Sequence, residues 1–132
     1  MRKSSLHKLL PAVIMLPIIM FAGCSPSTSG SAVAIESYFY ALEVKDLNQM
    51  VSLSCAEWEA QARLEYDSFA AVDTILEEIA CQPGAEQDGI ILVTCEGRII
   101  ASYGAEDLII ELNERTYKAV LEGGEWLMCG NQ

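Results

Sequence analysis

The spacing of apolar residues changes once along the chain, and this change constrains the fold more than any other feature. Between residues 32 and 69 the spacing is helical, which predicts a helix at 32–44, a short helix capped by Asp46 and a helix at 56–69. Beyond residue 73, β-branched residues and turn signals predict strands at 74–81, 90–103, 108–112, 117–121 and 125–129. This order favours an α+β fold, in which three N-terminal helices pack on a curved antiparallel sheet of about four strands.

Polar residues and one glycine within these segments predict which helix side faces solvent and where the strands are irregular. One side of the helix at 56–69 is apolar, and the rest is covered by Glu57, Glu59, Gln61 and Glu65. The segment 74–81 contains the adjacent residues Glu77 and Glu78, so its strand pattern is the poorest of the set. Gly97 interrupts the longest strand segment, where we expect a bulge.

Basic residues precede a short apolar run at the amino end. The run at 9–22 has 14 residues, whereas a membrane-spanning helix needs about 20. A basic start and a short apolar stretch are typical of a secretory signal peptide. The exit of the run, Phe-Ala-Gly-Cys at 21–24, resembles the bacterial lipobox, although Phe21 stands where leucine is commonest. An uncleaved anchor, or an ordinary signal peptide cut near Ala22, is the alternative.

The lipobox resemblance implies that Cys24 is lipidated and becomes the first residue of an exported protein. One acyl chain binds a protein to a membrane only weakly, whereas two acyl chains hold it stably. A diacylglyceryl group on Cys24 would therefore be a durable anchor. We therefore divide the chain into a signal peptide at 1–23, the lipidated cysteine with a flexible tether at 24–31, and a single domain at 32–132. The domain is expected on the extracytoplasmic side, anchored to the cell membrane or to an outer membrane.

The charge of the chain limits its partners. There are 8 basic and 19 acidic residues, and removal of the signal peptide leaves 5 basic residues against 19, a net charge of −14. A domain this acidic repels phosphate backbones, so we expect no nucleic-acid partner. It would also stand off from anionic lipid headgroups.

Four cysteines follow Cys24, an even number in an oxidising compartment, and we expect them to form disulfides. Four cysteines allow three pairings. Cys81 and Cys95 flank a turn-rich stretch and could face each other across a hairpin, which leaves Cys55 with Cys129. Four free thiols or a zinc site are the alternatives, but no two cysteines have zinc-like spacing and no histidine follows the signal peptide.

The end of the chain has a pattern that carries a family resemblance. The pattern is Tyr-x-x-Val-x-x-x-Gly-Gly-x-Trp-x-x-Cys, formed by Tyr117, Val120, Gly123, Gly124, Trp126 and Cys129. Together with the stretch YFYALEVKDLNQM at 38–50, it resembles small secreted proteins of the NTF2-like superfamily over residues 34–130. The resemblance implies a cone-shaped fold with an apolar cavity between helices and sheet, and both favoured disulfide pairs would suit it. Some members of that superfamily are isomerases or dehydratases.

No catalytic set is recognised in the sequence, and we expect no cofactor and no metal site. Aromatic residues are the candidates for lining a pocket: Tyr38, Trp58, Tyr66, Tyr103 and Trp126. A catalytic base would have to be a carboxylate with a raised pKa, for which the candidates are Asp73, Glu77 and Glu111. Carboxylates at such strand positions mostly face solvent. The arginines are spread along the sequence and predict no anion clamp.

Three hypotheses follow from these observations. The first is a non-catalytic lipoprotein module that binds a small apolar ligand or an envelope protein. The second is a small isomerase, dehydratase or hydrolase with a carboxylate base, and the third is a structural module that forms a homodimer through its sheet. A filled core would favour the third hypothesis, whereas an open cavity with a buried carboxylate would favour the second.

Overall fold

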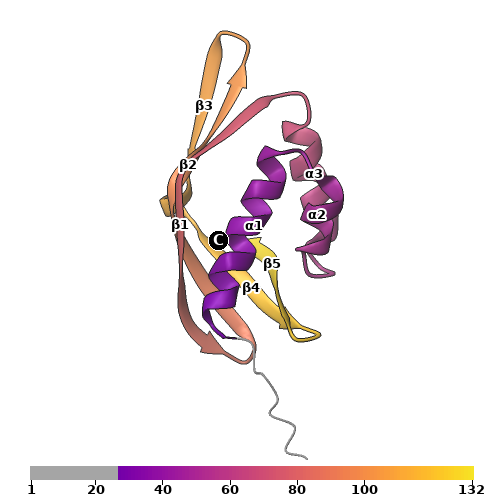
Figure 1. Ribbon diagram of the computed structural model, residues 1–132, viewed down its shortest axis with the longest axis vertical. Helices are drawn as coiled ribbons and strands as arrows, with labels where there is room; N and C mark the ends of the chain where they lie inside the picture. The colour runs from indigo at the N-terminus through magenta and orange to yellow at the C-terminus, as the bar shows by residue number, and fades with distance from the viewer. Residues whose placement is uncertain (1–26) are drawn as a thin grey trace, which may run out of the picture.

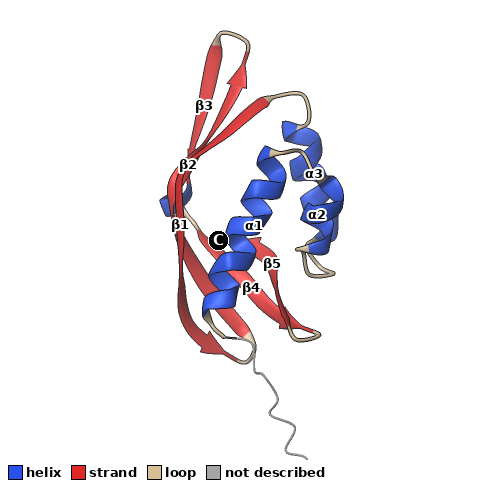
Figure 2. Cartoon of the chain, in the orientation of Figure 1, coloured by secondary structure: helices blue, strands red, loops and turns tan. Residues whose placement is uncertain are grey.

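Three helices precede five strands in the computed structural model, which describes residues 27–132 (Figure 1). The elements are α1 (Ser29–Glu43), α2 (Leu47–Ser52), α3 (Glu59–Phe69), β1 (Asp73–Gln87), β2 (Ile90–Tyr103), β3 (Glu106–Glu111), η1 (Leu112–Glu114), β4 (Thr116–Glu122) and β5 (Glu125–Asn131). The helices lie on one side of the antiparallel sheet (Figure 2), so the predicted α+β class is confirmed. The predicted signal peptide and Cys24 lie outside the described residues. Within residues 27–132, none of the helices combines the length and apolar character needed to cross a bilayer.

All five predicted strand segments join one sheet, where we expected a sheet of about four strands, because one edge of β2 pairs with two partners in succession. The strand order is β1-β2-β4-β5, and β3 also pairs with β2. Residues 90–94 of β2 pair with β4, and residues 98–103 pair with β3. The 14 residues of β2 are long enough for both. As a result the β2–β3 hairpin extends past the helices (Figure 2).

Strand β1 is longer than the predicted 74–81 and absorbs most of the turn-rich stretch that follows. It continues to Gln87, so that the turn into β2 contains only Asp88 and Gly89. Pro83 is tolerated because β1 is an edge strand of the sheet.

A bulge lies where Gly97 predicts one, but the extra residue belongs to β1. Glu77 pairs with Arg98 and Ala80 with Glu96, so two residues of β1 lie opposite Gly97. Gly97 has φ 92°, and a Cβ there would lie 2.5 Å from the carbonyl oxygen of Glu77. Only glycine therefore allows the two strands to approach this closely.

Helix α1 begins three residues before the predicted domain boundary at Ala32, so the tether predicted at 24–31 is too long. The side chain of Trp126 packs against Gly30, and its Nε1 donates a hydrogen bond to the carbonyl oxygen of Ser27 at 3.0 Å. Ser31 is buried and its hydroxyl donates to the carbonyl oxygen of Thr28 at 2.6 Å. Small residues at this end let the helix lie directly on β5, which makes residues 27–31 part of the domain.

The remaining helix boundaries follow local hydrogen bonds. Asp46 Oδ1 accepts from the backbone N–H of Gln49 at 3.0 Å, as the capping pattern predicts. Helix α3 begins at Glu59 rather than at Ala56, because Cys55 is held to β5: its N–H donates to the carbonyl oxygen of Met128 at 2.8 Å.

The disulfide bonds expected from the cysteine count are present. Cys55 is bonded to Cys129 and Cys81 to Cys95, at sequence separations of 74 and 14 residues. The second pair joins residues that face each other in the β1–β2 register. The first pair joins the segment between α2 and α3 to β5, and thereby connects the helical layer to the sheet.

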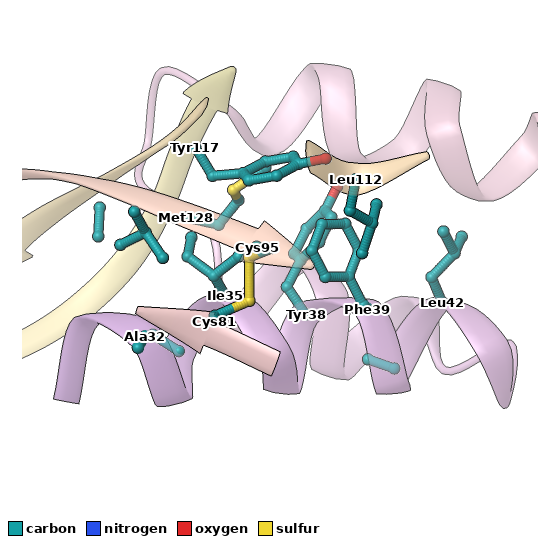
Figure 3. Close-up of a cluster of buried hydrophobic side chains, with 14 of the residues drawn as sticks. Ala32, Ile35, Tyr38, Phe39, Leu42, Cys81, Cys95, Leu112, Tyr117 and Met128 are labelled. Atoms are coloured by element: carbon teal, nitrogen blue, oxygen red, sulfur yellow. A yellow bond between two sulfur atoms is a disulfide. The ribbon is translucent and has the colours of Figure 1, made fainter. Parts of the chain in front are cut away.

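The core lies between α1 and the face of the sheet that the helices cover. Alternate residues of β2 are buried on this face, including Ile91, Val93 and Cys95. Ile35 and Tyr38 of α1 are fully buried against them, and Figure 3 shows these helix side chains pointing toward the sheet. This packing also positions the side chains described next.

Candidate ligand-binding pocket

A partly open cavity of about 140 Å³ lies between α1, α3 and the covered face of the sheet. Its walls are mostly apolar. They include Phe39 and Leu42 of α1, Phe69 of α3, and Ile99, Tyr117 and Met128 of the strands. Several of these side chains converge in Figure 3. Three polar side chains, those of Glu65, Arg115 and Asn131, complete the lining.

Glu65 is the carboxylate of this pocket, and it is half-buried on the inner side of α3. Its Oε2 accepts a hydrogen bond from the hydroxyl of Tyr38 at 2.7 Å. Burial raises the pKa of Glu65, while the Tyr38 hydrogen bond and the charge of Arg115 oppose this rise. Burial, followed by the negative charge of Glu65, raises the pKa of Tyr38 well above its usual range. Tyr38 therefore remains a neutral hydrogen-bond donor to Glu65.

Arg115 brings a positive charge to the same pocket. It lies between η1 and β4, and its side chain is exposed. Within residues 27–132 no ion pair joins it to Glu65; the ion pairs found there are made by Arg98. Burial raises the pKa of the neighbouring Tyr117 to about 12, with Arg115 acting in the opposite direction and Glu65 in the same direction. The pocket thus holds two opposite charges that influence each other without contact.

The prediction for Glu65 was wrong, since we assigned it to the solvent-covering side of its helix. In the structure it shares the inner side of α3 with Ala62, which is fully buried, and with Phe69. The spacing from Ala62 to Glu65 is three residues, and from Glu65 to Phe69 four, which places all three on one helix face. That spacing was the signal that could have identified it.

The five aromatic residues predicted to line a pocket have different environments. Tyr38 is buried and reaches the cavity through its hydrogen bond to Glu65. Trp126 packs on the start of α1, Tyr66 packs half-buried against the core, and Tyr103 is 51% exposed at the end of β2. Trp58 lies against Gly130, and its buried Nε1 has no hydrogen-bond partner among the described residues. The cavity lining contains none of these five residues.

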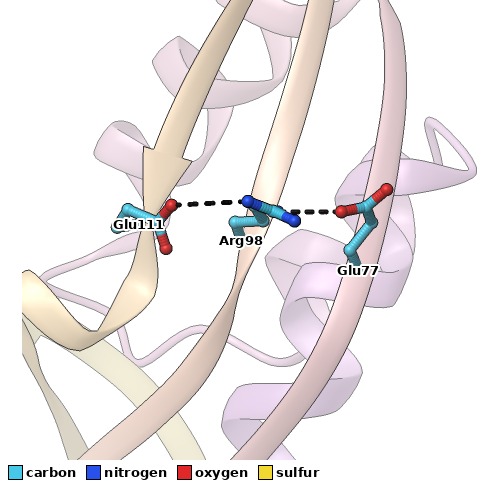
Figure 4. Close-up of polar contacts among 3 residues, drawn as sticks. All are labelled: Glu77, Arg98 and Glu111. Atoms are coloured by element: carbon cyan, nitrogen blue, oxygen red, sulfur yellow. Dashed lines mark hydrogen bonds and ion pairs between the residues drawn. The ribbon is translucent and has the colours of Figure 1, made fainter.

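The three carboxylates predicted as candidate bases lie outside the cavity. Figure 4 shows Glu77 and Glu111 on either side of Arg98, across three neighbouring strands. Arg98 Nε lies 2.8 Å from Glu77 Oε2, and Arg98 Nη1 lies 3.9 Å from Glu111 Oε1. The side chains of this group are 42–44% exposed. Asp73 is exposed at the start of β1.

Two further hollows are open depressions on the surface. The larger, of about 500 Å³, lies beside Ile90 and Leu92 on the sheet face that the helices leave uncovered. The other, of about 220 Å³, lies beside Trp58 and Lys118. No group of three or more histidine, cysteine, aspartate or glutamate side chains within residues 27–132 lies close enough together to hold a metal ion. The cavity at Glu65 is therefore the candidate site.

Comparison with known proteins gives evidence on the fold of this chain and on nothing else. No protein family model and no curated protein sequence matches it. Among solved structures, it is similar to a SEC-C motif containing protein from Rhodopseudomonas palustris, with a TM-score of 0.56 and 12% identity over 81% of this chain and 80% of that one. It is also similar to the helical cell shape determining protein Pgp2 from Campylobacter jejuni, with a TM-score of 0.50 and 11% identity over 75% of this chain. The match spans only 38% of Pgp2.

Proposed function

We propose that this chain is an exported lipoprotein whose single domain binds a small, mainly apolar ligand without transforming it. The observation that carries the proposal is the cavity, which combines apolar walls with a few polar side chains. This composition is typical of small-molecule sites, where apolar surface supplies affinity and a few polar groups orient the ligand. The alternative partner, an envelope protein, would have to insert a side chain into the same cavity.

The proposed location rests on the amino-terminal sequence and is compatible with the disulfide bonds. Disulfides persist in oxidising compartments, which agrees with an extracytoplasmic domain. Only residues 25 and 26 separate Cys24 from Ser27, which accepts the Trp126 hydrogen bond. A lipid on Cys24 would therefore hold the domain close to the membrane surface. Intact-mass measurement of the protein from membranes tests this, since an unmodified Cys24 would contradict it.

Membership of the NTF2-like superfamily remains our proposal for the fold family. Three helices on one face of a curved sheet, with a cavity between the two layers, support it. A cavity between helices and sheet is what the resemblance implies, and its carboxylate comes from α3 rather than from the strand positions predicted above. Superposition on solved structures of the superfamily, with the helices and strands matching in order and direction, would test this assignment.

A matched pair of substitutions tests ligand binding in this cavity. Ile110 lines the cavity, whereas its neighbour Ile109 is 52% exposed on the opposite face of β3. We expect Ile110→Trp to fill the cavity and abolish binding of benzyl alcohol as a ring-sized probe, measured by ligand-observed NMR on the mature chain carrying Cys24→Ser. Ile109→Trp should bind like the parent. Equal binding by both variants would contradict the proposed site.

A proton-transfer enzyme is the second candidate function, and the Tyr38–Glu65 pair is the observation that favours it. A carboxylate with a raised pKa beside a neutral hydroxyl donor could act as a base toward a bound carbonyl compound. Exchange of α-protons of small ketones for deuterium, followed by NMR, would detect such activity. If exchange occurs with the parent and is lost in Glu65→Gln, the enzyme hypothesis replaces the binding hypothesis.

We further propose that the chain forms a homodimer through the face of the sheet that the helices leave uncovered. Ile75, Ile100 and Ile109 lie side by side across β1, β2 and β3 on the uncovered face, and the outer two are 54% and 52% exposed. An apolar row of this kind can pack against a second sheet. Light scattering on the Cys24→Ser chain tests it: a monomeric mass at high protein concentration would contradict it.

A further inference from the structure

The cavity limits the apolar part of any ligand to a small group. Its volume is about 140 Å³, close to that of an apolar cavity of about 150 Å³ that holds benzene in another protein. A single six-membered ring or a short branched alkyl group therefore fills it. A larger ligand would extend through the open side, past Arg115.

Glu65 offers a negative charge that has no cationic partner among the described residues. Its Oε2 receives the Tyr38 hydroxyl, and this is the only hydrogen bond that residues 27–132 provide to the carboxylate. A half-buried carboxylate loses hydration, and a cation at hydrogen-bond distance restores that loss. An ammonium group on the ligand, placed next to its apolar part, would supply this cation.

Arg115 offers the opposite charge at the edge of the same cavity. It makes no ion pair within residues 27–132, although its charge acts on both Glu65 and Tyr117. A guanidinium group binds a carboxylate through two parallel hydrogen bonds. Because Arg115 and Glu65 are separated by more than ion-pair distance, a head group that carries both charges can lie between them.

We propose that the ligand is a free α-amino acid with an apolar side chain, whose ammonium group binds Glu65, whose carboxylate binds Arg115, and whose side chain occupies the apolar cavity. This inference rests on the proposed ligand-binding function and names its ligand class. Arg115 would repel a ligand whose head group is an amine alone. The net charge of −14 of the processed chain would repel a ligand whose head group is a carboxylate alone. A zwitterion avoids both costs and satisfies both side chains.

The test uses four compounds that share one ring and differ in their head groups. They are L-phenylalanine, phenethylamine, 3-phenylpropionate and 2-phenylethanol, each titrated calorimetrically into the mature chain carrying Cys24→Ser. A charge-assisted contact is worth about a factor of ten in affinity, so L-phenylalanine should bind at least about tenfold more tightly than each of the other three. Its affinity should fall as the pH is lowered through the pKa of Glu65, because protonation removes the charge that holds the ammonium group.

Matched substitutions assign the two contacts. Glu65→Gln should weaken L-phenylalanine about tenfold and remove the pH dependence, while Glu59→Gln on the exposed side of the same helix should have no effect. Arg115→Gln should weaken L-phenylalanine and leave phenethylamine unchanged or tighter, while Arg63→Gln should change neither. The compound series on the parent protein decides the question even where a variant fails to fold.

The possible failures separate the two proposals. If 2-phenylethanol or phenethylamine binds as tightly as L-phenylalanine, the amino-acid inference is wrong and the pocket remains a ligand site. If none of the four compounds binds, and the probe used for the Ile110→Trp and Ile109→Trp comparison does not bind either, the proposed function itself is wrong.

Discussion

Replacing Cys55 and Cys129 together with alanine should lower the free energy of unfolding by about 4 kcal/mol. This bond closes a loop of 74 residues, whereas the Cys81–Cys95 bond closes one of 14. In the chain-entropy account the stabilisation grows with the logarithm of loop length, which gives about 4 kcal/mol for the first bond and about 3 kcal/mol for the second. A domain of this size has a total stability of roughly 5–15 kcal/mol, so either loss is large.

The two double variants form a matched comparison, because all four cysteines are buried. Their exposed fractions are 0% and 8% for the long-range pair and 6% and 1% for the hairpin pair. The cavity left by each substitution is therefore similar, and the difference between the variants reports mainly on loop length. Urea unfolding of the parent, C55A/C129A and C81A/C95A, followed by far-UV circular dichroism and extrapolated to water, gives the three free energies.

Loss of the Cys55–Cys129 bond should also affect the pocket. The bond lies just before α3, which carries Glu65 and Phe69 into the cavity lining. We expect C55A/C129A to bind ring-sized ligands more weakly than C81A/C95A at a temperature where both are folded. A C81A/C95A variant that loses as much stability as C55A/C129A, or more, would refute the loop-length reasoning.

Three further predictions concern single residues. Gly97→Ala should destabilise the domain by more than about 2 kcal/mol in urea unfolding, because the left-handed backbone and the approach to Glu77 both oppose a side chain. Gly104→Ala, where a Cβ meets nothing within 4 Å, should cost less in the same measurement. Burial raises the pKa of Glu65, so the folded state binds its proton more tightly than the unfolded state, and the parent should lose stability as the pH rises through that raised pKa. Glu65→Gln should therefore be more stable than the parent at pH 7 and equal to it well below pH 4, and the reverse order would contradict the burial of this carboxylate. The pKa of Tyr117 is raised to about 12, whereas an unfolded tyrosine has a pKa of about 10. The parent should therefore lose stability as the pH rises between these two values. Tyr117→Phe should lose less stability over the same pH range in alkaline titrations followed by circular dichroism.

Part of the candidate site could be read from the sequence, and part could not. The apolar faces of α1 and α3 were predicted from their period, and Tyr38 was among the candidate pocket residues. Glu65 is missed because the segment 56–69 contains as many polar as apolar residues; its spacing from Ala62 and Phe69 places it on their face, but a glutamate is ordinarily expected on the solvent side. Arg115 has no recognisable pattern in the sequence either, since a single arginine beside a turn gains a role only when the fold brings it to the cavity that Glu65 of α3 also lines.

Residues a few positions apart are enough to predict the order of helices and strands, the Asp46 cap and a bulge at Gly97, and the number of cysteines is enough to predict disulfides. In contrast, the pairing of β2 with both β3 and β4 and the inclusion of residues 27–31 in the domain follow from the packing of the folded chain. The same packing selects Glu65 as the carboxylate of the cavity, since Tyr38 and Glu65 are 27 residues apart in sequence and meet only where α3 lies beside α1. The physical reason is that periodicity is a local property, whereas burial and hydrogen bonding between distant residues depend on the packing of the whole chain.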